Sequence, residues 1–181
     1  SSTHPADAMA DLADSNFRLH DSLLTHTDIA GQFALAQQVQ RMLDVELALA
    51  EAEAAIGIIP LNCVEPIRAA ADAKLYDHTR LAAEVARTGN PTIPVVQHLT
   101  RRVAETAPDA AHYVHWGATS QDILDTALEL QLRDTVSRVL GDTHRAALAA
   151  ADLARRHART PQAGRTWLQQ ATPVTFGLKA A

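Results

Sequence analysis

Residues 114–126, with the sequence VHWGATSQDILDT, join a polar turn to the start of a long helix. Thr119 and Ser120 are residue types that cap helices, and Asp122 stands three positions after Thr119, as in a capping box. The first turn of a helix leaves N–H groups unpaired, and these groups bind anions. His115, Thr119 and Ser120 are therefore candidate catalytic residues that act on a carboxylate. An ordinary helix cap would use the same residue types.

Two other polar turns could also meet an anionic ligand. One offers a guanidinium, a hydroxyl, an indole and an amide, at Arg165, Thr166, Trp167 and Gln169. The other contains Gly89 and Asn90, next to a predicted helix start. We treat all six as candidate substrate-binding residues. The alternatives are a loop packed by Trp167 as a hydrophobic plug and, at 88–90, a plain connection.

The sequence contains no clear motif for a metal or a cofactor. His112 and His115 with Asp122 lack a clear third and fourth ligand nearby. The chain carries no nucleophile triad, P-loop or dinucleotide fingerprint. We therefore expect neither a metal nor a cofactor.

Composition narrows the class of protein. The 181 residues are 47% apolar and 4% aromatic, with a net charge of −5. This balance favours packed helices and argues against nucleic acid or an anionic membrane as a partner. No apolar run could span a bilayer, Cys63 has no partner for a disulfide, and no signal peptide is evident. We expect an all-α, cytoplasmic protein.

Helical spacing and breakers predict the elements. The first 28 residues, with His20 and His26, are weakly periodic and suggest a loose arm. In the next helix, the pattern places Asp44, Glu46, Glu51 and Glu53 away from the apolar face. The helices are expected at 31–56, shortly after residue 62, and at 77–87, 93–105 and 120–159, with a connection at 107–112.

The last predicted helix is too long for a small domain. Forty residues make a helix of roughly 60 Å, whereas a domain of this size has a radius of gyration of about 16 Å. Some of its packing partners must therefore lie outside this chain. After it we expect a polar turn at 164–170 and a new helix capped at Thr172 and Pro173. That helix has no stop signal, so we expect the chain to be part of a longer protein.

Two segments carry a resemblance to a known family. HWGATSQD at 115–122, followed by Asp125 and Thr126, and GRTWLQQATPVTFG at 164–177 resemble the fumarase/aspartase superfamily. Shorter matches are MLDVE at 42–46, AEAE at 50–53 and GNPTIP at 89–94, so the resemblance covers about 31–181. It is strongest to the bacterial members that close 3-carboxy-cis,cis-muconate to 4-carboxymuconolactone.

The resemblance implies a fold, an assembly and a division into regions. After the loose arm at 1–28, it implies an N-terminal helical domain at 29–112 and, at 113–181, the first long helices of a fumarase/aspartase-type bundle. It also implies a homotetramer acting on a small polycarboxylate, with active sites built from three regions of different subunits. The third region, which bears a serine implicated in proton transfer, is expected beyond residue 181. The chain alone is therefore expected to be inactive.

Trp167 separates two branches of the family. Adenylosuccinate lyase and its relatives resemble this segment but carry histidine at that position, where it is tied to acid–base chemistry. A lactonising enzyme uses an ionised substrate carboxylate as the nucleophile and needs no base to activate it. We therefore expect a cycloisomerase. The alternatives are a lyase of the adenylosuccinate type and a non-catalytic helical assembly module.

Overall fold

The computed structural model describes residues 27–181 of the chain. The predicted arm, with His20 and His26, falls almost wholly outside this range. The structure divides into two compact units, with the boundary between Thr135 and Val136. The predicted boundary at 112/113 remains a prediction. Within 27–181, no helix combines the length and the hydropathy that a membrane span requires.

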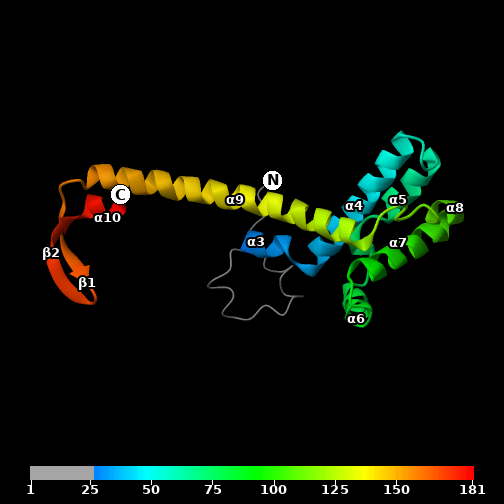
Figure 1. Ribbon diagram of the computed structural model, residues 1–181, viewed down its shortest axis with the longest axis horizontal. Coiled ribbons are helices and arrows are strands. Elements are labelled where there is room, and N and C mark those ends of the chain that lie inside the picture. Colours follow the sequence, from blue (N-terminus) through cyan, green and yellow to red (C-terminus); the bar gives the residue numbers. More distant parts are fainter. Residues whose placement is uncertain (1–26) are drawn as a thin grey trace. The chain divides into compact units, whose positions relative to one another are not determined.

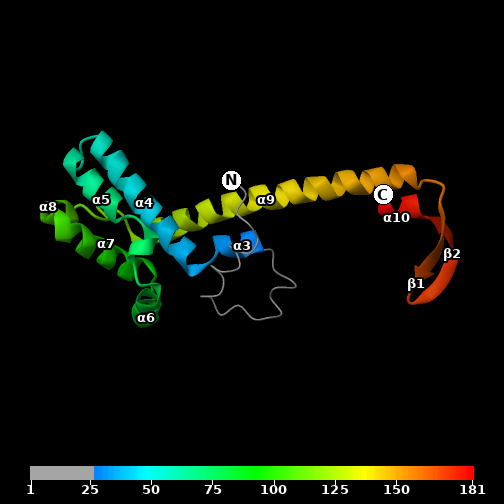
Figure 2. The same cartoon turned by 180° about the vertical axis from the view of Figure 1, so that it is seen from behind.

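The first unit is a group of helices that pack around α4 (Figure 1). Figure 2 shows the same helices from behind. In chain order the elements are α3 (Thr27–Gln32), α4 (Leu35–Ala55), η1 (Leu61–Cys63), α5 (Val64–Ala70), η2 (Ala73–Leu75), α6 (His78–Thr88), α7 (Thr92–Thr106), α8 (Pro108–Ala111) and the start of α9 (Ser120–Arg156).

Local signals explain most of these helix ends. Asp77 caps α6 by accepting a hydrogen bond from the Arg80 N–H at 3.0 Å, and Gly89 ends the helix in the left-handed region, at φ 68°. The Asn90 side chain accepts from the Thr92 N–H at 2.9 Å, where α7 begins. The predicted helices at 77–87 and 93–105 are confirmed. The predicted connection at 107–112 instead contains the short helix α8, which has proline in its first turn.

The core is a single cluster centred on α4, α5 and α7. Leu43, Leu99 and Val103 are fully buried, and Ile123 and Ala127 bring the first turns of α9 into the same cluster. The helix predicted at 31–56 is interrupted at residues 33–34, so α4 begins only at Leu35.

Two charged residues of α4 were placed on the wrong face by the sequence pattern. Glu46 and Glu53 are buried, with 2% and 9% of their surface exposed, although periodicity assigned them to faces away from the core. They continue the buried stripe of Val39, Leu43 and Ala50 at spacings of three and four residues. The pattern failed because it sorts side chains by polarity, whereas Glu46 has a partner across the fold, His115, that allows its carboxylate to be buried.

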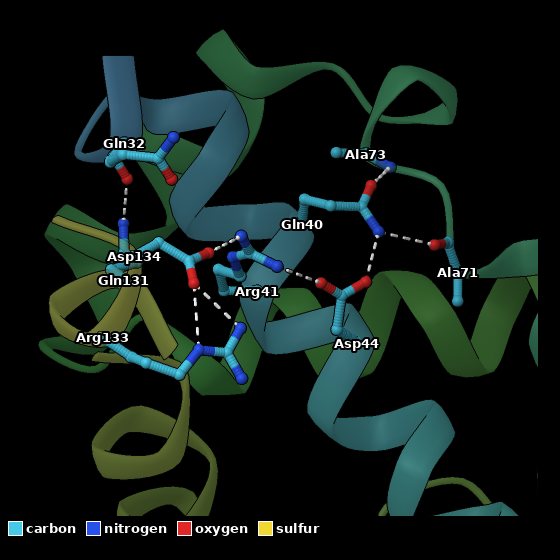
Figure 3. Close-up of polar contacts among 9 residues, drawn as sticks. All are labelled: Gln32, Gln40, Arg41, Asp44, Ala71, Ala73, Gln131, Arg133 and Asp134. Carbon is cyan, nitrogen blue, oxygen red and sulfur yellow. Dashed lines mark hydrogen bonds and ion pairs between the residues drawn. The ribbon is translucent and has the colours of Figure 1, made fainter. Parts of the chain in front are cut away.

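A polar network joins α4 to the early part of α9 (Figure 3). The Arg41 guanidinium contacts Asp134 at 2.7 Å and Asp44 at 3.2 Å. Its side chain is about three-quarters buried, so these contacts are better protected from water than surface ion pairs. The Gln131 amide donates to the carbonyl of Gln32. The early part of α9 is therefore held by charge pairs as well as by the apolar cluster.

The second unit contains the end of α9, a β-hairpin and the short helix α10 (Phe176–Ala180). Strands β1 (Pro161–Thr166) and β2 (Gln169–Thr175) are antiparallel, and Thr166 pairs with Gln169 across a two-residue turn. The all-α class is confirmed at the level of the chain, since this small hairpin is the only sheet within 27–181. The helix predicted at 120–159 is confirmed, although it ends at Arg156. The polar turn predicted at 164–170 is wrong in its extent, because only Trp167 and Leu168 form a turn and the other residues lie in the two strands.

The predicted helix start at Thr172 and Pro173 is also wrong, because both residues lie in β2. The cap of α10 is Thr175, whose hydroxyl accepts from the Leu178 N–H at 3.2 Å. Proline has no N–H for a ladder but fits a two-stranded sheet, where every strand has a free edge. The Thr-Pro pair therefore fits a strand as well as a helix start.

Gly177 fixes the contact of α10 with the end of α9, which predicts a destabilised variant. A Cβ at this position would lie 2.6 Å from the Ala154 carbonyl oxygen and 2.7 Å from the Ala158 Cα, both backbone atoms. We expect Gly177→Ala to release α10, with faster amide hydrogen exchange at 176–180. Gly141→Ala is the control, because nothing lies within 4 Å of its Cβ position and alanine should stabilise the helix by about 0.5–1 kcal/mol. Equal protection of 176–180 in both variants would contradict this account.

Candidate carboxylate site

The candidate site is centred on the turn that connects α8 to α9. His115 and Gly117 both adopt left-handed backbone conformations, at φ 58° and 68°. The second is ordinary for glycine, but a left-handed residue with a side chain is destabilised by about 1–2 kcal/mol. The turn therefore holds His115 in a conformation that surrounding contacts must enforce.

The predicted cap at the start of α9 is half formed. The Asp122 carboxylate accepts from the Thr119 N–H at 2.9 Å, which is the reverse arm of a capping box. The hydroxyls of Thr119 and Ser120 make no hydrogen bond within residues 27–181, and Thr119 is exposed. Both hydroxyls are therefore available to a ligand at the N-terminus of a 37-residue helix.

His115 is held by a buried carboxylate of α4. Its Nδ1 lies 2.6 Å from the Oε1 of Glu46, whose side chain is 1% exposed, while the His115 side chain is 20% exposed. Burial raises the pKa of Glu46; the contact with His115 opposes this effect, and the nearby charge of Glu53 adds to it. The other oxygen of Glu46, Oε2, is buried without a hydrogen-bond partner. The bond to His115 is thus the main polar compensation for burying Glu46.

A second buried carboxylate lies beneath the same turn. The Oε1 of Glu53 is 3.8 Å from the position that a Cβ would take on Gly117, and its Oε2 has no hydrogen-bond partner. Burial raises the pKa of Glu53. Glu46 and Glu53 therefore place two acidic groups, two helical turns apart, under the segment from His115 to Gly117.

The loop with Gly89 and Asn90 is tied to the same region. The hydroxyl of the buried Thr92 donates to the Ser120 carbonyl at 3.2 Å, and the Thr92 N–H donates to Asn90. The structure thus brings together five predicted residues, because His115, Thr119 and Ser120 share one turn and Thr92 connects that turn to the Gly89–Asn90 loop.

The other predicted residues lie on the hairpin of the second unit. Arg165 and Thr166 end β1, Gln169 begins β2, and Trp167 with Leu168 forms the turn between them. Both turn residues have positive φ, 45° and 64°, as a type I′ turn requires. Trp167 is 93% exposed, so the alternative in which it plugs a loop is wrong for this chain. Arg165 forms no ion pair within residues 27–181 and is exposed.

His112 does not join a metal site with His115. It lines an open cavity of about 610 Å³ together with Cys63, Asp109 and Trp116. Burial raises the pKa of the Cys63 thiol, and the charge of Asp109 adds to the effect, so the reactive thiolate is disfavoured. Among residues 27–181, no three potential ligands are gathered around one point.

Comparison with known proteins identifies the family. A family model described as "lyase" matches residues 4–181. The chain belongs to this lyase family. The family is part of the fumarase/aspartase superfamily, which confirms the resemblance seen in the sequence.

Individual relatives agree with this family and differ in chemistry. 3-Carboxy-cis,cis-muconate cycloisomerase of Pseudomonas aeruginosa is 49% identical, over 91% of this chain and 36% of the relative. Nitrosuccinate lyase of Streptomyces davaonensis is 42% identical, over 86% of this chain and 33% of the relative. The solved 3-carboxy-cis,cis-muconate lactonizing enzyme of Pseudomonas putida has a TM-score of 0.87 at 44% identity, covering 91% of this chain and 37% of that one. The chain spans about a third of the length of these relatives.

The sequence analysis did not identify Glu46 and Thr92 as residues of this site. Glu46 was read as a solvent-facing charge, and Thr92 was not singled out. A signal for Glu46 was present, because it falls seven residues after Val39 and four before Ala50 on the apolar stripe. Thr92 gave no comparable signal, since its partner is a carbonyl group 28 residues away.

Thr92 should carry the coupling between the two loops. Thr92→Val keeps the shape but removes the hydroxyl that bonds to Ser120, so we expect a loss of about 1–2 kcal/mol in unfolding free energy. Thr100→Val is the matched control on α7, because its hydroxyl bonds only to the Val96 carbonyl of its own helix. Denaturant unfolding measures both variants. An equal loss in the two would show that the contact with Ser120 contributes nothing.

The buried Glu53 should make stability depend on pH. Its raised pKa means that the folded protein binds the proton more tightly than the unfolded chain, so its burial penalises folding above the raised pKa. The penalty on the free energy of folding grows as the pH rises from the usual carboxyl pKa to the raised pKa of Glu53. We expect Glu53→Gln to gain up to about 1 kcal/mol relative to wild type at pH 8 compared with pH 4. Denaturant unfolding at both pH values checks this, with the exposed Glu129→Gln as control, and a gain confined to pH 4 would contradict it.

Proposed function

We propose that the protein containing this chain closes 3-carboxy-cis,cis-muconate to 4-carboxymuconolactone, and that this chain supplies carboxylate-binding parts of the site. The observation that carries the proposal is the 49% identity to a cycloisomerase over 91% of the chain. Trp167 supports the proposal independently. The segment around it resembles adenylosuccinate lyase and its relatives, but those enzymes carry histidine at this position.

The chemistry of lactonisation matches the groups that this chain offers. One substrate carboxylate attacks an alkene carbon, so a C–O bond forms, a C=C π bond breaks, and a proton adds to the neighbouring carbon. The attacking carboxylate is already ionised at neutral pH and needs no base. The demand is instead to stabilise negative charge as it develops on another carboxylate, which preoriented N–H and O–H donors do well.

The described contacts support particular roles. The unpaired hydroxyls of Thr119 and Ser120, together with the first-turn amides of α9, suit a substrate carboxylate. His115 adds a donor or a positive charge beside them. Asn90 adds an amide through the loop that Thr92 ties to Ser120.

The hairpin suits contact with a further surface. An exposed indole and an exposed leucine at a strained turn are unfavourable in water unless something covers them. We propose that another copy of the protein covers Trp167 and receives Arg165, Thr166 and Gln169 as substrate-binding groups, within a homotetramer. Several apolar residues of α9, among them Leu128, Leu132, Val136 and Leu148, are also exposed. Their exposure supports packing against further helices.

A lyase is the second candidate function. The 42% identity to nitrosuccinate lyase favours it, because an enzyme with a similar sequence is named for an elimination. Such a reaction acts on a succinyl-type substrate, whose carboxylates the same helix N-terminus could bind. The absence of histidine at position 167 argues against it, because the resemblance ties that histidine of the adenylosuccinate-type lyases to acid–base chemistry on an amine or alcohol leaving group.

The assay follows the loss of diene absorbance with the full-length protein. We expect turnover of 3-carboxy-cis,cis-muconate by the wild type and a loss of about 100-fold or more in Thr119→Ala/Ser120→Ala, on the scale of removing a transition-state donor. Thr79→Ala, an exposed threonine of α6, is the control and should retain wild-type turnover.

Three outcomes would change these assignments. Unchanged turnover in the double variant would remove the roles given to the two hydroxyls. Release of fumarate from adenylosuccinate, or elimination from nitrosuccinate, without lactonisation would establish the lyase. A folded full-length protein that converts none of these substrates would favour a non-catalytic assembly module.

A further inference from the structure

Glu46 is a buried acid that the packing of α4 does not require. It lies on the apolar stripe between Leu43 and Ala50, where an uncharged side chain would fill the space without desolvating a carboxylate. One of its oxygens has no partner, and the other is 2.6 Å from His115. A carboxylate kept at this position has one specific contact, and that contact is with a predicted catalytic residue.

The contact commits one nitrogen of the imidazole and leaves the other available. Nδ1 of His115 faces Glu46, and Nε2 makes no hydrogen bond within residues 27–181. Which ring nitrogen carries the proton is set by the hydrogen bond of the other one. An ionised Glu46 would hold the proton on Nδ1, whereas a protonated Glu46 would donate to Nδ1 and place the ring proton on Nε2. These two arrangements give the histidine opposite chemistry at its free nitrogen.

The backbone indicates that the ring is held in place rather than resting in a relaxed conformation. His115 keeps a left-handed conformation, at φ 58°, in a turn whose next glycine is also left-handed. Glu46 lies 69 residues earlier in the chain, so its bond with His115 joins the turn to the buried face of α4. Strain of this kind persists when the surrounding contacts determine the geometry.

We propose that Glu46 is a positioning residue for the reaction: its carboxylate accepts the Nδ1 proton of His115, fixes the ring orientation and, when Nε2 also carries a proton, directs that N–H to the substrate carboxylate beside Thr119 and Ser120. This inference rests on the proposed function for its kinetic part but not for its structural part. When the ring also takes up a proton, the buried carboxylate balances its charge. Glu53 and His115 are the titratable groups whose charges act on Glu46, the first from α4 itself and the second from the turn.

The structural part is tested by ¹⁵N spectra of the histidine rings in the full-length protein, with His115→Gln used to assign the signal. We expect a proton on Nδ1 of His115 in the wild type at pH 8. Glu46→Leu should lose that preference, and Glu46→Asp should retain it in part. An unprotonated Nδ1 in the wild type would overturn the proposal, because Glu46 would then be the donor. This measurement needs no activity and is decisive even if the proposed function fails.

The kinetic part uses the lactonisation assay. We expect Glu46→Gln to lower kcat by about 10- to 100-fold, the usual effect of removing a group that orients a ligating or catalytic histidine, with less than about a twofold change in KM. Glu46→Asp should recover part of the rate. Glu84→Gln is the matched control, since it neutralises a carboxylate that also contacts a histidine, His98 at 2.8 Å, but lies outside the candidate site, and it should keep kcat.

A double-mutant cycle separates positioning from a general structural role. If Glu46 acts through His115, then Glu46→Leu should change kcat by less than about twofold in a His115→Gln background. An equal loss in both backgrounds would overturn the proposal, as would an unchanged kcat in Glu46→Gln. Thermal unfolding of each variant shows whether it is folded, and the near-isosteric Glu46→Gln serves the test if Glu46→Leu does not fold. If the wild-type protein does not catalyse lactonisation, the proposed function is refuted. The ¹⁵N spectra then still test whether Glu46 accepts the Nδ1 proton of His115.

Discussion

The first unit depends on the buried stripe of α4. A helix that packs against neighbours on several sides must bury a residue every three or four positions, and Val39, Leu43 and Ala50 do so here. The same spacing carries Glu46 and Glu53 into the interior. Burying a carboxylate is strongly unfavourable unless it is hydrogen-bonded, so the stripe creates a demand that another part of the chain must meet. His115 meets it for Glu46, and the α8–α9 turn is therefore coupled to the core.

This coupling explains why so short a turn can hold a definite shape. Its first half is anchored by the bond from His115 to Glu46, and its second half by the Asp122 carboxylate on the Thr119 N–H. Thr92 adds a third connection, to Ser120. Three contacts, from α4, α7 and α9 itself, therefore hold the turn at the N-terminus of α9 in place. A ligand that binds there meets donors already in place, which lowers the cost of ordering them.

The parts of this fold that the sequence predicted are those with local causes. Asp77, Gly89 and Pro94 act on their own helix ends, so α6 and α7 could be placed within a residue or two. The hairpin could not, because a type I′ turn is normally announced by Asn-Gly or Asp-Gly, and here Trp167 and Leu168 take the left-handed positions. The burial of Glu46 was not predicted for a different reason. Its spacing places it on the apolar stripe, but the partner that allows a carboxylate there is 69 residues away, and no pattern within α4 identifies that partner.

Two of the failed predictions fall where the chain accepts a local penalty. A charge is buried at Glu46, and two bulky residues are strained and exposed at the hairpin tip. Neither feature improves the stability of the unit that contains it, and each lies within a segment that the lyase-family match covers. Penalties of this kind are characteristic of functional sites. At the first site the buried carboxylate lies 2.6 Å from an imidazole, and at the second an indole is exposed at the tip of a hairpin. The hydrogen bond between His115 and a buried carboxylate, and the unpaired donors at the N-terminus of α9, together suit the stabilisation of negative charge on a carboxylate.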